Sequence, residues 1–272
     1  MDSGLHPRVS RVGESFPKLR LDMDGLGSRE QLLIDEFRAA CHALADRLDG
    51  MVFADDDDRR IKMRYLFYFT KGSRTFAAFA RLVEDGYTDE ARILTRANFE
   101  LVVDLLCFDK APKDFAQQLG DWLEATEWEA QRFGTPSTRA TTDAEAAKSH
   151  FCAKYDLKKF PKHWSGKDTI ECRARAVGLA DSYEGPYRFM CSLAHGGAYA
   201  IASYLDLSSP DIAGFRISPD WADSAQVVRE GCIWLLDCLH SVAEGLQLSS
   251  YEVIHRLHVL LHGTGPSDGP TP

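Results

Sequence analysis

TDEARILTRANFELVVDLLCF, residues 88–108, is the stretch of sequence that decides the fold. Apolar side chains occupy most positions around this predicted helix, and a helix that is apolar on most sides is usually buried. Its charged residues form a row in which each comes four positions after the last: Arg92, Arg96, Glu100 and Asp104. Residues four apart share a helix face, so the row forms a strip on the order of 18 Å long. We therefore predict a buried central helix with one polar row.

The polar row has two interpretations. In the first, Arg96 and Glu100 form an intrahelical ion pair, and the row holds neighbouring helices in register. In the second, Arg96, Glu100 and Asp104 line a pocket in which the arginine binds an anion and a carboxylate acts as acid or base. Both interpretations require partners for the row, because a lone buried charge costs several kcal/mol.

Length, charge and cysteine usage restrict the class of protein. The chain has 272 residues and a formal net charge of −9, which argues against a broadly basic nucleic-acid-binding surface but leaves a local basic site open. Its seven cysteines are scattered, with no C-x-x-C, which predicts free thiols and a reducing compartment. No run reaches the ~18 apolar residues of a membrane span, and no secretory signal precedes the first helix. We expect a cytoplasmic protein without membrane contact.

Helical periodicity continues through most of the chain and predicts an all-α fold. We expect a single bundle-like domain of about eight helices over residues 28–263. Residues 1–27 form a loose N-terminal arm, residues 264–272 a disordered tail, and residues 134–167 a candidate hinge or insertion.

Capping residues mark two of the helix starts. Ser28 with Gln31 fits a capping box, and Thr88 is the expected N-cap of the central helix. A short extended piece is expected at residues 215–217.

A second group of candidate residues surrounds His195. A histidine before two glycines is typical of a helix end, where it is either structural or a general base. Ser192 lies three positions earlier on the same face, and Arg188 completes an R-x6-H spacing. That spacing resembles the catalytic motif of helical HEPN ribonucleases, although Phe189 stands where those enzymes usually carry a polar residue.

No metal or cofactor is predicted. His258 and His262 have the spacing of a zinc pair, and His255 is nearby, but no acid neighbours His258 as in H-E-x-x-H. A surface or interface stripe explains these histidines better. The basic segment 156–167 contains Trp164 and is either a solvated loop or a contact for a phosphate-bearing ligand.

Two short motifs together resemble a known family. They are L-x-R-x-x-F-E, ending at Glu100 after G-x4-A and before Asp104, and S-x-x-H-G at residues 192–196. This pattern is similar to a widespread bacterial family of all-helical proteins of unknown function, and covers roughly residues 60–200. The resemblance implies that Arg96, Glu100 and His195 belong to one site. It implies no reaction, and leaves a distant kinship with HEPN-type defence proteins open.

Two functional hypotheses follow. In the first, the protein is catalytic or ligand-binding, with RNA cleavage in a defence or toxin setting as its most concrete form. Its predicted catalytic residues are Arg96, Glu100, Asp104 and His195, and its predicted binding residues are Arg92, Arg188 and Ser192. In the second, the protein is a non-catalytic interaction or sensing module and the polar set is a buried structural network. The sequence does not distinguish between RNA, another phosphate-bearing ligand and a protein, including a second copy of the chain, as the partner.

Overall fold

The computed structural model describes residues 25–134, 138–166, 169–195, 205–206, 214–215, 220–221 and 223–263. Helices dominate these residues and confirm the predicted all-α class. The long helices are α1 (Ser28–Leu48), α2 (Asp56–Glu84), α3 (Thr88–Asp109), α4 (Pro112–Gly134), α5 (Thr138–Lys154), α10 (Ser224–Gly245) and α11 (Tyr251–His262). The short ones are α6 (Ile170–Ala176), α7 (Ala180–Ser182), the π-helical turn η1 (Tyr183–Tyr187) and α8 (Arg188–Ala194).

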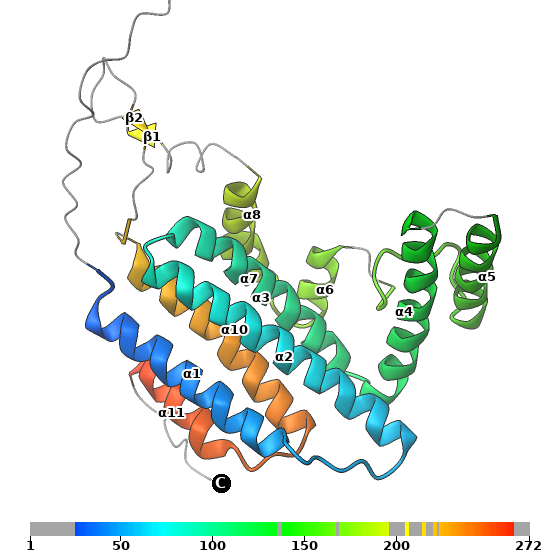
Figure 1. The fold of residues 1–272 in the computed structure, drawn as a ribbon, viewed down its shortest axis with the longest axis horizontal. Coiled ribbons are helices and arrows are strands. Elements are labelled where there is room, and N and C mark those ends of the chain that lie inside the picture. The colour runs from blue at the N-terminus through cyan, green and yellow to red at the C-terminus, as the bar shows by residue number, and fades with distance from the viewer. Residues whose placement is uncertain are drawn as a thin grey trace, which may run out of the picture.

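The helices form a main bundle with two additions (Figure 1). In the bundle, α2, α3 and α10 pack against one another, while α1 and α11 pack on α10 and on each other. One addition is α4 with α5, a pair that projects from one end of the bundle. The other is the run from α6 to α8, in which α6 and α8 pack on α3. The helix α3 therefore lies between the bundle and this second layer.

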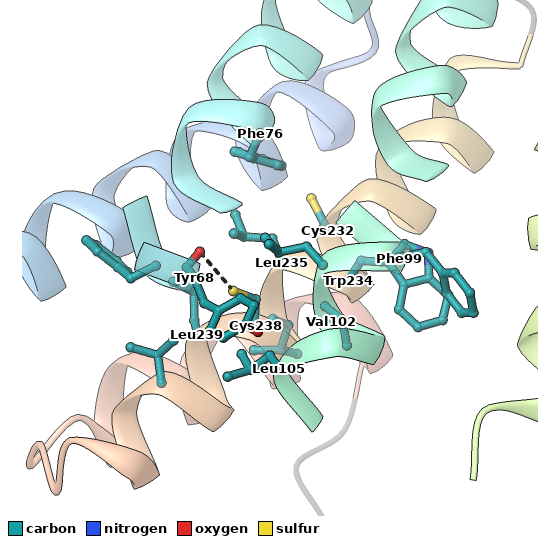
Figure 2. Packing of buried hydrophobic residues seen from close by; sticks show 14 of the residues in the cluster. Tyr68, Phe76, Phe99, Val102, Leu105, Cys232, Trp234, Leu235, Cys238 and Leu239 are labelled. Atoms are coloured by element: carbon teal, nitrogen blue, oxygen red, sulfur yellow. Dashed lines mark hydrogen bonds between the residues drawn. The ribbon is translucent and has the colours of Figure 1, made fainter. Parts of the chain in front are cut away.

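The core confirms that the central helix is buried. Phe99, Val103 and Leu105 of α3 are fully buried, as is Phe108 near its end. Figure 2 shows Phe99 and Val102 of α3 close to Trp234 and Leu235 of α10. Apolar burial of this kind supplies the main favourable free energy of folding, at about 25 cal/mol per Å².

One glycine allows α2 and α10 to approach each other closely. A Cβ atom built on Gly231 of α10 would lie 2.4 Å from Cζ of Phe79, whose ring is fully buried in α2. No side chain fits in that space without moving the ring, so the spacing of the two helices depends on this glycine.

Two expected helix caps are wrong by one residue. Gly27, not Ser28, is the N-cap of α1, and the side chain of Gln31 donates to Asp35 and Glu84 instead of to a cap. Helix boundaries predicted from sequence are uncertain by about this much.

The N-cap of α3 also lies one residue earlier than expected, and here a contact of Thr88 explains the difference. Tyr87, not Thr88, is the N-cap of α3. The hydroxyl of Thr88 donates to the backbone carbonyl of Asp220 (3.3 Å), and the Asp220 amide donates to the carbonyl of Gly86 (2.9 Å). Thr88 therefore ties a remote segment to the helix instead of capping it.

The only strands among the described residues are β1 (Leu205–Asp206) and β2 (Gly214–Phe215). They pair antiparallel, with Leu205 opposite Phe215. The extended piece expected at residues 215–217 therefore begins in β2, and its last two residues lie outside the described ranges. Residues 1–24 and 264–272, for which an arm and a tail were predicted, also lie outside them.

The segment proposed as a hinge or insertion, residues 134–167, contains α5 and the chain that follows it. The helix α5 packs on α4, and its role as a hinge stays a prediction. None of the seven cysteines forms a disulfide, and Cys107, Cys232 and Cys238 are buried as small apolar side chains. Within the described ranges, no helix is both long and apolar enough to cross a membrane.

Candidate functional site

The polar row begins at Arg92, which is buried and doubly paired. Its Nη1 donates to Oδ1 of Asp89 and its Nη2 to Oδ2 of Asp223, each at 2.9 Å. The ring of Phe189 from α8 lies 5.6 Å from the guanidinium carbon, a cation–π distance. Only 6% of the Arg92 side chain is exposed, so two carboxylates and an aromatic face replace its hydration. This arrangement links α3 to both α8 and the start of α10.

The centre of the row is a triad of Arg96, Glu100 and Tyr187. Nη2 of Arg96 lies 2.8 Å from Oε1 of Glu100, and the Tyr187 hydroxyl donates to the same oxygen at 2.6 Å. The guanidinium also stands over the Tyr187 ring, 5.4 Å from its centre. The side chains of Arg96 and Glu100 keep 26% and 37% of their surface exposed, so the triad lies at the edge of the helical layers and not in the deep core.

Electrostatics within the triad follow from burial and hydrogen bonding. Burial, and then the hydrogen bond to Glu100, raise the pKa of the Tyr187 hydroxyl, so the tyrosine stays protonated and acts as a donor. Burial alone would lower the pKa of Arg96. The hydrogen bond to Tyr187 and the charge of Glu100 outweigh that effect and raise it. The triad therefore holds one arginine cation, one carboxylate and one neutral phenol.

Tyr187 reaches the triad because of the irregular turn that carries it. The turn η1 contains Pro186, whose missing amide suits an interruption of regular α-helical hydrogen bonding. The Tyr187 ring then packs on Phe99, with ring centres 4.9 Å apart. The aromatic core of the bundle thus positions the hydroxyl that contacts Glu100.

Asp104 ends the row and is also paired. Its Oδ1 lies 2.9 Å from Nε of Arg173 on α6, and its Oδ2 lies 3.1 Å from Nε2 of His163. The other ring nitrogen of His163 lies 2.9 Å from the Ser165 hydroxyl. The carboxylate therefore joins α3 to α6 and to the loop before it. Trp164 in this loop is buried against Phe115, so it is a core residue and not an exposed stacking platform.

The contacts of the row among the described residues do not include His195. It ends α8 as the C-cap, its side chain is exposed, and no hydrogen bond or ion pair within the described ranges joins it to Arg96 or Glu100. Arg188 is exposed at the start of α8, where it pairs with Glu184 at 3.0 Å, and Ser192 is partly buried. The structure thus brings Arg96 and Glu100 together, while it leaves His195 outside their contacts.

Sequence reasoning missed the partners of the row, which are Asp223, Tyr187, Arg173 and His163. His163 was visible only as part of the basic segment, and Tyr187 only as the residue after Gly-Pro. On α11 the rings of His258 and His262 lie 4.5 Å apart. Among the described residues, no group of three or more His, Cys, Asp or Glu side chains is placed to hold a metal ion.

Comparison with known families decides the classification. A family model described as a family of unknown function (DUF5677) matches residues 64–212. The chain belongs to this family. The DUF5677 match includes α3, α6 and α8, and hence the whole row, its Tyr187 and Arg173 partners, and His195. No curated protein and no solved structure matches the chain.

Proposed function

We propose that this DUF5677 protein is a non-catalytic interaction or sensing module, and that the polar row on α3 is a structural network. One observation carries the proposal: every charged side chain of the row is already paired within the chain. Arg92 has two carboxylates, Arg96 has Glu100, and Asp104 has Arg173 and His163. A catalytic acid or base needs a proton-transfer position aimed at a substrate, and a phosphate-binding arginine needs free donors. Here Arg92 uses both terminal nitrogens and Arg96 uses Nη2 in these pairs, whereas the Nε atoms of both arginines are buried with no hydrogen-bond partner among the described residues.

The triad gives the first test of this proposal. We expect Glu100→Gln to lower the free energy of unfolding by about 1 kcal/mol, because it removes the charge that Arg96 and Tyr187 contact while the triad stays partly solvated. Tyr187→Phe should cost a similar amount. Chemical denaturation of both variants and of their double variant should reveal a coupling of about 0.5 kcal/mol or more.

Glu124→Gln is the matched control, because Glu124 is exposed on α4 and makes no ion pair within the described residues. It should change stability by no more than about 0.5 kcal/mol. If Glu100→Gln behaves like this control and the cycle shows no coupling, the row does not support the fold and the structural proposal fails.

A second candidate function is RNA cleavage of the HEPN type. It is favoured by the exposure of Arg188 and His195, which lie seven positions apart and hence on one face of α8 and its C-cap. The pairing of Arg188 with Glu184 and the net charge of −9 count against it, because phosphate binding is largely electrostatic.

His195→Ala decides between the two candidates. Under the proposed non-catalytic function, we expect purified wild type and variant to leave a labelled RNA equally intact, with thermal midpoints that agree closely because His195 is exposed. His42→Ala, at an exposed histidine of α1, is the control. RNA cleavage by the wild type and by His42→Ala, reduced by about 100-fold or more in His195→Ala, would overturn the proposal and favour a general acid or base at His195.

A cytoplasmic location and a protein partner, including a second copy of the chain, belong to the same proposal. The absence of a disulfide among the seven cysteines supports a reducing compartment.

A further inference from the structure

A cavity of about 360 Å³ lies between α10 and α11, away from the polar row. Leu236, Leu248 and Ile254 are among its apolar lining residues. Asp237 and His258 are among its polar ones. Small-molecule sites are commonly of this size, mostly apolar, with a few polar groups that converge.

Asp237 has an unusual position in this cavity. Its side chain is partly buried, and no hydrogen bond or ion pair joins its carboxyl to another residue in the described ranges. Burial raises the pKa of Asp237 to about 6, although nearby His240 lowers it. Buried acids without a partner are rare, because desolvation of the charge is not compensated. A ligand that supplies the missing partner would remove this cost.

The imidazole of His258 is a second polar group in this cavity that lacks a hydrogen-bond partner within the described part of the chain. Nδ1 of His258, on α11, is buried and has no hydrogen-bond partner among the described residues. At the rim, in contrast, Nε2 of His240 lies 3.1 Å from Oε1 of Glu244, and the two form a closed pair. The two unsatisfied groups therefore come from the two helices that face each other across the cavity.

We propose that the α10–α11 cavity binds a small primary amine, with its ammonium group held by Asp237 and His258 and its apolar body on Leu236, Leu248 and Ile254. A primary ammonium has three donors and no acceptor, which suits a carboxylate and an unprotonated imidazole nitrogen. An anion would instead meet the charges of Asp237 and Glu244. This site is separate from the row on α3, so its failure would leave the structural role of the row unaffected.

Titration calorimetry with the full chain tests the proposal, with benzylamine as the cationic probe. At pH 7.5 we expect saturable binding of benzylamine, and at least tenfold weaker binding of benzyl alcohol and of benzoate, which keep the ring but lack the ammonium. Asp237→Asn should weaken benzylamine binding at least tenfold while the variant stays folded, because it removes a buried charge and keeps the shape. Asp181→Asn, at an exposed aspartate of α7, should bind like wild type.

The pH dependence gives an independent readout. Benzylamine binding should weaken as the pH falls through about 6, where Asp237 takes up a proton. The other titratable side chains that line the cavity are His240, Glu244, His255 and His258. Arg47 of α1 donates to the backbone carbonyl of Ser249, next to the lining residue Ser250. Tighter binding of benzoate, an unchanged affinity in Asp237→Asn, or no saturable binding of benzylamine would each overturn the proposal.

Discussion

Replacement of Phe99 by alanine is expected to lower the free energy of unfolding by about 3–5 kcal/mol. The ring is fully buried, and its centre lies 4.9 Å from those of both Tyr187 and Trp234. Alanine would leave a cavity between α10 and the turn that carries Tyr187, in addition to the lost transfer free energy of the ring. Phe99 therefore joins α10 of the bundle to Tyr187 of the triad.

Chemical denaturation measures this effect, and Phe67→Ala is the matched control. Phe67 lies on α2 and is 50% exposed, so the same truncation should cost about 1 kcal/mol or less. Equal effects of the two substitutions would contradict the central position assigned to Phe99. A Phe99→Ala variant in which the coupling between Glu100 and Tyr187 persists unchanged would show that the triad is assembled without this ring.

The second large effect is expected for Gly231→Ala, at about 2–4 kcal/mol of destabilisation. The added methyl group would meet the buried Phe79 ring at 2.4 Å, so either the ring or one of the two helices must move. Overpacking of a close-packed core typically costs 1–3 kcal/mol and sometimes more. The helix propensity of alanine offsets this cost by only about 1 kcal/mol.

Gly120→Ala is a control that separates the steric clash from the gain in helix propensity. Gly120 is also in a helix, α4, and a Cβ there would lie 3.5 Å from Nη2 of Arg64, an ordinary contact. This variant should be more stable than wild type by about 0.5–1 kcal/mol, since it gains helix propensity without a clash. Thermal midpoints that rise for both variants would show that α2 and α10 can separate at little cost.

The central helix was the most predictable part of the fold. Residues 88–108 were expected to be helical and buried, and α3 runs from Thr88 to Asp109 with its apolar residues in the core. Local spacing determines this result. A four-residue period of charges on an otherwise apolar segment indicates a buried helix. The intrahelical pair of Arg96 and Glu100, which one of the two interpretations of the row contains, rests on the same local spacing and is present in the structure.

The partners of the row were not predictable in this way. Tyr187 and Arg173 come from the second layer, and Asp223 precedes α10, more than a hundred positions from Arg92 along the chain. The periodicity of a segment does not indicate which side chains from distant parts of the chain contact a given face of its helix. The proximity of His195 to the row was inferred from two short motifs and not from spacing. The close contact at Gly231 was equally invisible, because a helical glycine does not reveal which ring lies against it.

The π-helical turn η1 determines the direction in which the side chains of α8 point relative to α3. Such a turn contains one residue more than an α-helical turn, and each residue of an α-helix advances the side-chain direction by 100°. Tyr187, Arg188 and Phe189 therefore point about 100° away from where an uninterrupted helix from α7 to α8 would place them. Contact of this layer with Arg92 and Glu100 depends on the number of residues in η1 as much as on their identity. Lengthening or shortening this turn by one residue would turn the covering side chains away from the row without changing any of them.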